Sequence, residues 1–328
     1  MAEKVSSVDV VGLGENVMDT LLLVDRYPAR GTKTHLLTSS RQPGGQVASA
    51  LVACRHLGLK ARYLGKFGDD ADAKQQIRSL KLESIDFEFC PTVSNCQGRT
   101  SVIIVDRATG ERTIYWNRDA RLAVKPEELN QEVICSGRVL FVDGQDVEAS
   151  TQAAKWAREA GLHVVADLDT LQPGIENLLP HLTHLIASKE FPRKVTGAYK
   201  MQTCLSQLHK NFGIPTVGVT LGPDGALLLD KGEFYYSPGY RVAAVDTTGA
   251  GDVFHGAFVY GLLQGWAWEK TLDFCNAFAA LNCTAIGARG SIRTQVEAEV
   301  LMERGSRNVN EEYRAPASVP ESSGATTQ

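Results

Sequence analysis

Short apolar runs in the first 120 residues predict a few buried elements and a small second sheet. Residues 8–13 and 61–66 are apolar enough for buried strands, and residues 47–57 and 73–80 have the pattern of helices. Further strands are predicted at residues 18–24, in the segment that follows up to residue 40, and at residues 98–105 and 112–116. A hairpin loop over residues 106–110 joins the last two strands. We expect residues 18–41 and 97–118 to form a small β-sheet lid that stands off the main core.

From residue 139 onward, strands alternate with helices. Apolar runs predict strands at residues 139–142, 163–167, 184–187, 215–221, 226–230 and 240–245. Helices are predicted at residues 150–160, 203–212, 253–263 and 272–286. This alternation predicts an α/β fold with a central, mainly parallel sheet flanked by helices. Ligands of such folds bind beyond the carboxyl ends of the strands, where the polar residues Asp19, Asp143, Glu190, Thr220 and Asp252 fall.

Composition limits the classes of function and the domain count. The 328 residues, 43% of them hydrophobic, suffice for one large core, which we place in a single domain over residues 1–303. The polar, Pro-, Ser- and Gly-rich segment 304–328 is predicted to be a disordered tail. The net charge of −4 and the lack of a basic run argue against a nucleic-acid partner.

Cysteine usage and the N-terminus predict a cytoplasmic protein. The seven cysteines are an odd number without a Cys-x-x-Cys pair, which argues against a disulfide framework and a zinc site and fits a reducing compartment. No signal sequence precedes the first strand. The apolar run near Val253 is too short to span a membrane and contains His255 and Gly256, so we expect no membrane partner.

The strongest chemical motif is residues 246–252, Asp-Thr-Thr-Gly-Ala-Gly-Asp, between an apolar run and the predicted helix 253–263. The first N–H groups of a helix lack partners within it, and the helix dipole adds positive charge there. Gly249 and Gly251 leave these N–H groups open to an oxyanion. Asp252 at the same place is a candidate general base that takes a proton from an attacking hydroxyl.

This motif, continued by residues 254–258, Phe-His-Gly-Ala-Phe, resembles the C-terminal signature of the ribokinase-like (PfkB) carbohydrate kinases. Residues 43–46, Pro-Gly-Gly-Gln, resemble the N-terminal signature of that family, so the resemblance spans about residues 8–300. It implies a ribokinase-like fold and a kinase that uses ATP and Mg²⁺. It also implies that Asp252 is the base and that the backbone N–H groups of Gly249, Ala250 and Gly251 bind the transferring phosphoryl group.

The same resemblance assigns the remaining site residues. It implies that the sugar is held by Asp19, Gly45, Gln46, Ser49 and Asp143, and the nucleotide by Thr220, Gly222, Gly225 and Asn276. Glu190 matches the acid of the family's Asn-x-x-Glu motif, which is linked to Mg²⁺ and phosphate. The loop 287–291, with Asp246 and Thr248, resembles the K⁺ site of many relatives.

Two departures from the family pattern bear on the substrate. Ser49 stands where the family usually has Asn, and Ala187 stands where the Asn-x-x-Glu motif has Asn. These departures look closer to fructose-type or ketohexose kinases than to ribokinase, so we expect a ketohexose such as fructose. Ribose and a nucleoside stay open as alternatives. A nucleoside would need an aromatic or apolar pocket under the lid, for which Trp116 is a candidate.

Other functions fit the sequence less well than that of a sugar kinase. A sugar phosphate or sulfosugar substrate would need cations at its distal anion, for which Lys33 and Arg99 are candidates, but Gln145 is neutral. A non-catalytic sugar or nucleotide sensor on a kinase fold would not need Asp252. A dehydrogenase is disfavoured because Val17 replaces the third glycine of a dinucleotide fingerprint. The exposed lid sheet suggests a homodimer.

Overall fold

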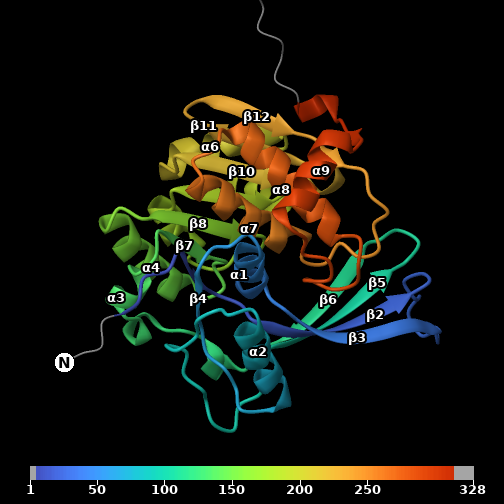
Figure 1. Ribbon diagram of the computed structural model, residues 1–328, viewed down its shortest axis with the longest axis horizontal. Coiled ribbons are helices and arrows are strands. Elements are labelled where there is room, and N and C mark those ends of the chain that lie inside the picture. Colours follow the sequence, from blue (N-terminus) through green and yellow to red (C-terminus); the bar gives the residue numbers. More distant parts are fainter. Residues whose placement is uncertain (1–4, 314–328) are drawn as a thin grey trace, which may run out of the picture.

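The central sheet organises the molecule. The computed structural model describes residues 5–313. The sheet consists of β1 (Val10–Leu13), β4 (Ala61–Leu64), β7 (Val139–Val142), β8 (His163–Leu168), β9 (His184–Ser188), β10 (Thr216–Thr220), β11 (Ala226–Asp230) and β12 (Glu233–Ser237). These strands lie in the order β12-β11-β10-β9-β8-β7-β1-β4 (Figure 1). All pairs from β4 to β10 are parallel, whereas β11 and β12 add an antiparallel edge.

Helices cover both faces of this sheet. On one face lie α1 (Gln46–His56), α2 (Ala71–Leu82), α7 (Ala250–Leu263), α8 (Trp268–Asn282) and α9 (Gln295–Arg304), and on the other lie α3 (Gln131–Ile134), α4 (Val147–Glu159), α5 (Glu190–Thr196) and α6 (Met201–Phe212). The strands β1 and β7 are apolar along their whole length because both of their faces are buried. The helix α7 packs between α1 and α8 and is buried along most of its length.

A second sheet forms the lid. It contains β2 (Val17–Val24), β3 (Leu36–Gly44), β5 (Thr100–Asp106) and β6 (Arg112–Asn117) in the order β3-β2-β5-β6, and it extends from the main body at the lower right of Figure 1. Its inner face buries Leu21, Ile103 and Val105, which pack with Ile286 of the main domain. The predicted fold class, a mainly parallel sheet flanked by helices with a small separate sheet, is therefore confirmed.

The remaining short elements join these layers. They are β13 (Gly239–Tyr240), β14 (Arg307–Asn308) and the 3₁₀ turns Ala120–Leu122, Pro126–Glu128, Ile175–Asn177, Leu179–His181, Gly222–Asp224 and Glu311–Tyr313. All seven cysteines are free thiols, five of them buried. Within residues 5–313, no helix combines the length and the apolar character that crossing a bilayer requires.

The predicted strand 240–245 is wrong over most of its length. Only its first residue belongs to a strand, because Gly239 and Tyr240 pair with β14. Beyond Arg241 the chain is a loop in which Val245 is 42% exposed. The N–H groups of Val245 and Asp246 donate to the carbonyl oxygen of Cys283 at 2.8 and 3.3 Å, so they bind the end of α8 and no neighbouring strand.

The predicted disordered tail begins too early. Residues 305–313 belong to the fold, because Arg307 donates to the carbonyl oxygen of Pro238 at 2.8 Å and the ring of Tyr313 is 2% exposed. The Tyr313 ring lies 5.8 Å from that of Tyr236, centroid to centroid. The burial of this one aromatic ring thus keeps residues 305–313 on the folded domain despite their polar composition. The predicted disorder of residues 314–328 concerns a part of the chain outside the described residues.

We expect the substitution Tyr313→Ala to lower the free energy of unfolding by about 2–4 kcal/mol, because it removes a buried ring from the edge of the core. Urea denaturation followed by circular dichroism measures this loss. Tyr199→Ala is the matched control, since the Tyr199 side chain is 82% exposed, and it should change stability by less than about 0.5 kcal/mol. Equal effects of the two substitutions would show that the segment 305–313 is not anchored.

Candidate active site

The strand order locates the candidate site. The chain leaves β1 towards β4 on one side and returns to β7 on the other, so the order of the sheet reverses at β1. Ligands of open α/β sheets bind at the carboxyl ends of the strands at such a reversal. Here Gly14, Glu15 and Asn16 follow β1, and Asp143 follows β7. The lid begins at Val17, directly beside this point.

The N-terminus of α7 presents free backbone donors. Gly249, with φ of 73°, precedes the helix, and a Cβ atom there would lie 2.2 Å from the carbonyl oxygen of Ala288, so this position requires glycine. At Gly251 a Cβ atom would meet nothing within 4 Å. The N–H groups of Gly251 and Asp252 bond no other group of the described chain, whereas the Ala250 N–H donates to Thr247 O at 3.3 Å. This is an anion-binding geometry.

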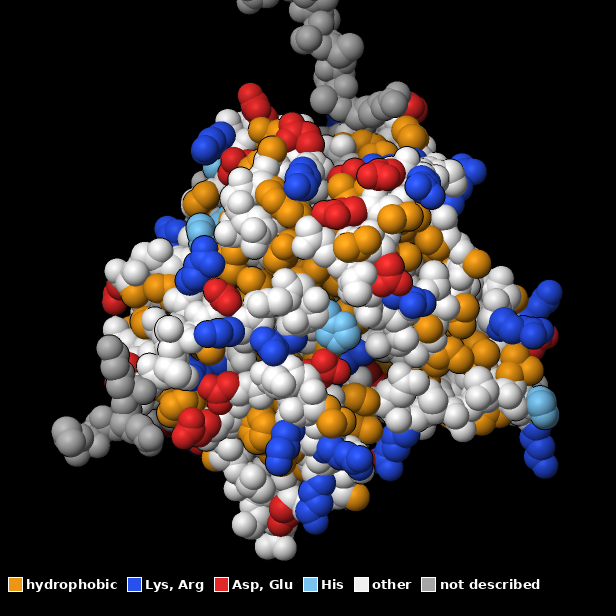
Figure 2. Space-filling model, in the orientation of Figure 1, with side chains coloured by type: hydrophobic (Ala, Val, Ile, Leu, Met, Phe, Trp, Pro, Cys, Tyr) orange, Lys and Arg blue, Asp and Glu red, His pale blue; other side chains and the backbone are white. Residues whose placement is uncertain are grey.

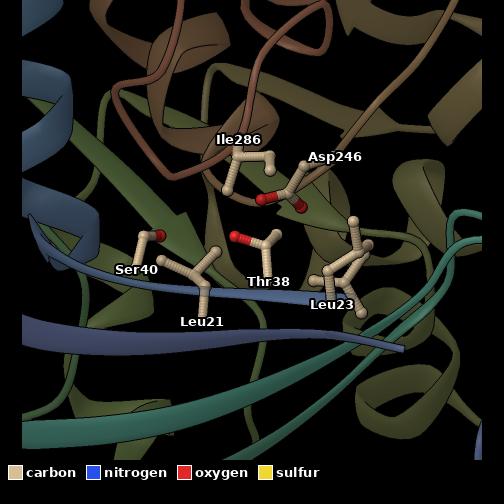
Figure 3. A pocket seen from close by; sticks show the side chains of 7 residues that line it. Leu21, Leu23, Thr38, Ser40, Asp246 and Ile286 are labelled. Carbon is tan, nitrogen blue, oxygen red and sulfur yellow. The ribbon is translucent and has the colours of Figure 1, made fainter. Parts of the chain in front are cut away.

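Asp246 fixes the loop that leads into α7. Its carboxylate is 1% exposed, and its Oδ1 accepts from the Thr248 backbone N–H at 2.9 Å and from the Thr248 hydroxyl at 2.7 Å. Its Oδ2 accepts from the Gly287 N–H at 2.8 Å. Figure 3 shows this carboxylate between Ile286 and the lid, beside a cavity of about 10 Å³. The carboxylate thus joins two loops, and a role of Asp246 and Thr248 in binding K⁺ stays a prediction.

The electrostatic surroundings of Asp252 favour its protonated form. Burial raises the pKa of Asp252 to about 8, with a further contribution from the Asp167 carboxylate, while His255 and Arg112 oppose the rise. The carboxylate accepts no hydrogen bond from another residue of the described chain. The positive end of the helix favours the anion, but burial prevails. A carboxylate with a pKa near neutrality is well matched to a general base.

A histidine and a second carboxylate lie beneath Asp252. The His255 ring Nδ1 lies 2.7 Å from the Gly251 carbonyl oxygen and 3.3 Å from Asp167 Oδ2, and its Nε2 lies 3.0 Å from the Ile186 carbonyl oxygen. Burial lowers the pKa of His255 and raises that of Asp167 well above its usual range. The sequence alone predicted no role for His255 or Asp167. The feature that could have indicated a role for His255 is its position in an otherwise apolar helix.

The predicted sugar-side residues gather around the start of α1. Asp19 is 5% exposed, and its Oδ1 accepts from the Ser101 hydroxyl at 2.5 Å. A Cβ atom at Gly44 would lie 1.9 Å from Asp19 Oδ2, so glycine leaves room for this carboxylate. Gly45 has φ of 93°, and a Cβ atom there would lie 2.7 Å from the carbonyl oxygen of Glu15. The two glycines therefore bring the entrance of α1 against the end of β1.

Ser49 is joined to an arginine that the sequence analysis did not single out. The buried Ser49 hydroxyl accepts from Arg289 Nε at 3.1 Å, and Arg289 Nη2 donates to the Gly44 carbonyl oxygen at 3.0 Å. Burial lowers the pKa of Arg289 to about 10. Burial raises the pKa of Asp19, and the Ser101 hydroxyl and the charge of Arg289 oppose that shift. The Gly-rich loop 287–291 thus supports the sugar side as well.

Asp143 joins the ends of β1 and β7. Its Oδ2 accepts from the Glu15 N–H at 2.6 Å, and its Oδ1 accepts from the Gln145 N–H at 3.0 Å. Burial and the charge of Glu15 raise its pKa to about 7. Asn16 nearby is 2% exposed, and neither its amide nitrogen nor its amide oxygen has a partner in the described chain. Asn16 is a further polar residue of this region that sequence reasoning missed.

Two other predicted sugar-side residues have identified neighbours. A hydrogen bond from the Gln46 amide opposes the rise of the Asp167 pKa that burial causes, so Gln46 faces the Asp167 carboxylate. Arg99 is 3% exposed, and it lies 3.5 Å from Asp146 and 3.9 Å from Glu15. Arg99 is therefore paired with acids. Asn117, a polar residue at the end of β6, is exposed.

The predicted nucleotide-side residues lie at the ends of β9 and β10 and on α8. Thr220 ends β10, and Gly222 has open space where a Cβ atom would stand. A Cβ atom at Gly225 would lie 2.1 Å from the Ser237 carbonyl oxygen, so this glycine serves packing. Asn276 donates to the same carbonyl oxygen at 2.8 Å, which gives its amide a structural partner. Glu190 begins α5 and pairs with Arg193 at 3.1 Å.

The described residues contain no group of three or more His, Cys, Asp or Glu side chains arranged to hold a metal ion. Glu190, the acid predicted to be linked to Mg²⁺, has a side chain that is 61% exposed.

Comparison with known proteins finds carbohydrate kinases over nearly the whole chain. Residues 7–295 match the pfkB family carbohydrate kinases. The ATP-dependent ribose-1-phosphate kinase of Halopiger xanaduensis is 28% identical over 299 residues, covering 90% of this chain and 99% of that protein. "Probable fructokinase-5" of Arabidopsis thaliana is 29% identical over 295 residues, covering 81% of this chain and 90% of that protein. Ribokinase of Thermotoga maritima superposes with a TM-score of 0.77 at 25% identity, covering 90% and 100% of the two chains.

We expect Asp252→Asn to stabilise the protein at pH 8 by at least about 1 kcal/mol, because each unit of pKa shift is worth about 1.4 kcal/mol. The folded-state pKa of about 8 lies above the ordinary value of 3.8. As pH rises from about 4 to 8, the unfolded chain has lost a proton that the native state still binds, so wild-type stability falls.

Urea denaturation at pH 3 and pH 8 measures this difference, which should vanish at pH 3, where both states are protonated. The exposed Asp25→Asn is the control and should change stability by less than about 0.5 kcal/mol at either pH. A gain of equal size at both pH values would contradict the raised pKa of Asp252.

Proposed function

Because this chain belongs to the pfkB family of carbohydrate kinases, we propose that it transfers the γ-phosphoryl group of ATP to a primary hydroxyl of a sugar. One observation carries the proposal. A carboxylate with a pKa raised to about 8 lies in the first turn of α7, beside backbone N–H groups that have no partner in the described chain. This arrangement places a proton acceptor and oxyanion donors within one helical turn.

In this proposal each group of the first turn of α7 has one task. The sugar oxygen forms a bond to the γ-phosphorus, the bond from that phosphorus to the bridging oxygen of ADP breaks, and the hydroxyl proton passes to Asp252. The N–H groups of Gly249, Gly251 and Asp252 bind the charged equatorial oxygens. Ala250 joins them once its contact to Thr247, 3.3 Å long, is released.

We assign the sugar to the cluster at the start of α1 and the nucleotide to the ends of β9 and β10. Asp19 and Asp143 have raised pKa values because they are buried, and each lies among polar donors, which suits hydrogen bonding to sugar hydroxyls. Gly45, Gln46 and Ser49 complete this side. Thr220, Gly222, Gly225 and Asn276 would hold the nucleotide.

Two cations complete the proposed site. Glu190 would hold Mg²⁺ through water, and bound Mg²⁺ would neutralise charge on the phosphates. The loop 287–291 with Asp246 and Thr248 is the proposed K⁺ site. There the Asp246 carboxylate already accepts three hydrogen bonds, so backbone carbonyl oxygens would have to supply most of the K⁺ ligands.

We propose a ketohexose such as fructose as the acceptor. The support is the pair of departures at Ser49 and Ala187, together with the 29% identity to the Arabidopsis protein whose name is "Probable fructokinase-5". Ribose is the second candidate, because the Thermotoga maritima protein of the same fold is a ribokinase. A nucleoside is the third, since Trp116 on the lid is 70% exposed. A non-catalytic sensor would not need the raised pKa of Asp252.

The lid also suggests self-association in a cytoplasmic enzyme. Large apolar side chains are exposed on or beside its strands, namely Tyr27, Leu36, Leu37, Val102, Ile114, Tyr115 and Trp116, and Figure 2 shows hydrophobic side chains gathered over the lid at the right of the view. Patches of this kind often mark interfaces. We propose a homodimer through the lid sheet. The free thiols fit a reducing compartment.

A screen of acceptors tests the proposed activity. We expect ATP consumption to depend on added sugar and to be fastest with D-fructose among hexoses, pentoses, sugar phosphates and nucleosides. ADP release is measured with Mg²⁺ in KCl and in NaCl, which also tests the K⁺ site. Slow ATP hydrolysis that no acceptor accelerates would support the sensor instead.

Replacing the proposed base separates chemistry from binding. We expect Asp252→Asn to lower kcat by ~10²–10⁴-fold, because the amide cannot take the proton, while sugar binding measured by calorimetry changes little. Asp25→Asn on the outer lid is the matched control and should keep the wild-type kcat. Wild-type turnover by the Asp252 variant would refute the assignment.

A further inference from the structure

The end of the described chain packs against the loop assigned to the nucleotide. Residues 305–313, here called the C-terminal segment, lie beyond the part of the chain that matches the kinase family, so that resemblance assigns them no role. The segment runs beside the end of β12, at the top of Figure 1. The proposed nucleotide loop, residues 220–225, joins β10 to β11, and β11 is the neighbour of β12 in the sheet.

A pair of short strands holds the C-terminal segment behind this loop. The strand β14 of the segment pairs with β13. The backbone of β13 is in tight contact with the loop, because a Cβ atom at Gly239 would lie 2.3 Å from the carbonyl oxygen of Pro223. Arg307 Nη1 donates at 2.8 Å to the carbonyl oxygen of Pro238, which also accepts from the Asn276 amide at 3.5 Å. The segment thus fixes the turn between β12 and β13, against which the loop and Asn276 pack.

Asn310 connects the C-terminal segment to the loop itself. Its Nδ2 donates to Asp224 Oδ2 at 3.2 Å, and its backbone N–H donates to the Tyr236 hydroxyl at 3.0 Å. That hydroxyl in turn donates to the Asp224 carbonyl oxygen at 2.9 Å. Both polar ends of one loop residue are therefore bound, the carboxylate by Asn310 directly and the carbonyl group through Tyr236. A hydrogen bond to a charged group such as this carboxylate is stronger than one between neutral groups.

The internal hydrogen bonds of the loop span a single 3₁₀ turn. The N–H groups of Asp224 and Gly225 donate at 3.3 and 3.1 Å to carbonyl oxygens of residues 221 and 222. Hydrogen-bond geometry in such a turn is poorer than in an α-helix. Gly222 begins the turn with φ of 61° and has open space where a Cβ atom would stand. A turn of this kind gains from a support outside it, and the C-terminal segment supplies one.

We propose that Asn310 is a positioning residue for the nucleotide, and that through it the C-terminal segment holds the nucleotide loop in its binding conformation before ATP binds. This inference rests on the proposed kinase function. When a loop is ordered in advance, binding no longer carries the entropy cost of ordering it. The segment therefore raises the affinity for ATP, although it belongs neither to the sugar side nor to the first turn of α7.

Steady-state kinetics of Asn310→Ala test this role, with Asn308→Ala as the matched control and with D-fructose or, if it turns over faster, D-ribose as the acceptor. Both asparagines are half-buried in the same segment, but the Asn308 side chain accepts from Arg241 Nε at 2.9 Å instead of bonding Asp224. We expect Asn310→Ala to raise the KM for ATP about 3–10-fold, as for loss of one hydrogen bond. Its kcat and sugar KM should change less than about twofold, and Asn308→Ala should match the wild type.

An exchange of the two partners separates this contact from a general loss of stability. Asn310→Asp places a second carboxylate opposite Asp224 and should weaken binding of a non-hydrolysable ATP analogue more than Asn310→Ala does, because like charges repel. Combining Asn310→Asp with Asp224→Asn restores a donor and an acceptor at the same contact. The dissociation constant of this double variant, measured by calorimetry, should return to within about threefold of the wild type.

Three outcomes would overturn the proposal: an affinity of both Asn310 variants for the analogue within about twofold of that of Asn308→Ala, no recovery in the double variant, or equal losses of kcat, sugar affinity and ATP affinity in Asn310→Ala. If the wild type binds the analogue and releases ADP in a sugar-dependent manner, these outcomes concern this inference alone. If it does neither, the kinase function fails first, and this inference falls with it.

Discussion

The buried carboxylate of Asp246 is the contact on which the rest of the site depends. It receives two hydrogen bonds from Thr248 and one from the Gly287 N–H, so one side chain holds the entrance of α7 against the loop after α8. That hold allows Gly249 to lie beneath Ala288 in a left-handed conformation. The first turn of α7 then keeps the N–H groups of Gly251 and Asp252 without a partner in the described chain, an arrangement that suits an anion.

The site also concentrates negative charge in a place where it is poorly solvated. Asp252, Asp167 and Asp143 are all shifted towards their protonated forms, mainly by burial. Burying an acid costs stability unless a partner compensates it. His255, whose Nδ1 lies 3.3 Å from Asp167 Oδ2, opposes the rise of the Asp252 pKa only in part. The fold therefore sustains a local cost around Asp252, as is common where function, and not stability, sets the environment.

The sequence predicted the fold class, the small second sheet and the Gly-rich loop before α7 because each has a local signature, but it wrongly placed a strand directly before that loop. Periodicity defines strands and helices, and glycines with Asp mark the loop at Gly249. It did not reveal Arg289, His255 or Asn310, whose partners Ser49, Asp167 and Asp224 are distant along the chain. Those contacts arise from packing and register, which periodicity alone does not contain. The same limit explains the tail, where Tyr313 finds its partner Tyr236 from far away in sequence.

The position of α7 has a consequence for how such a protein changes over evolutionary time. The helix that carries Asp252 is enclosed between α1 and α8 within the largest apolar cluster of the domain, whereas the lid is joined to that domain by a small apolar contact through Leu21, Ile103 and Val105. Mutations in the lid can therefore accumulate without disturbing the packing of the helix that carries Asp252. A family built this way can vary its lid while the core that positions this carboxylate stays intact.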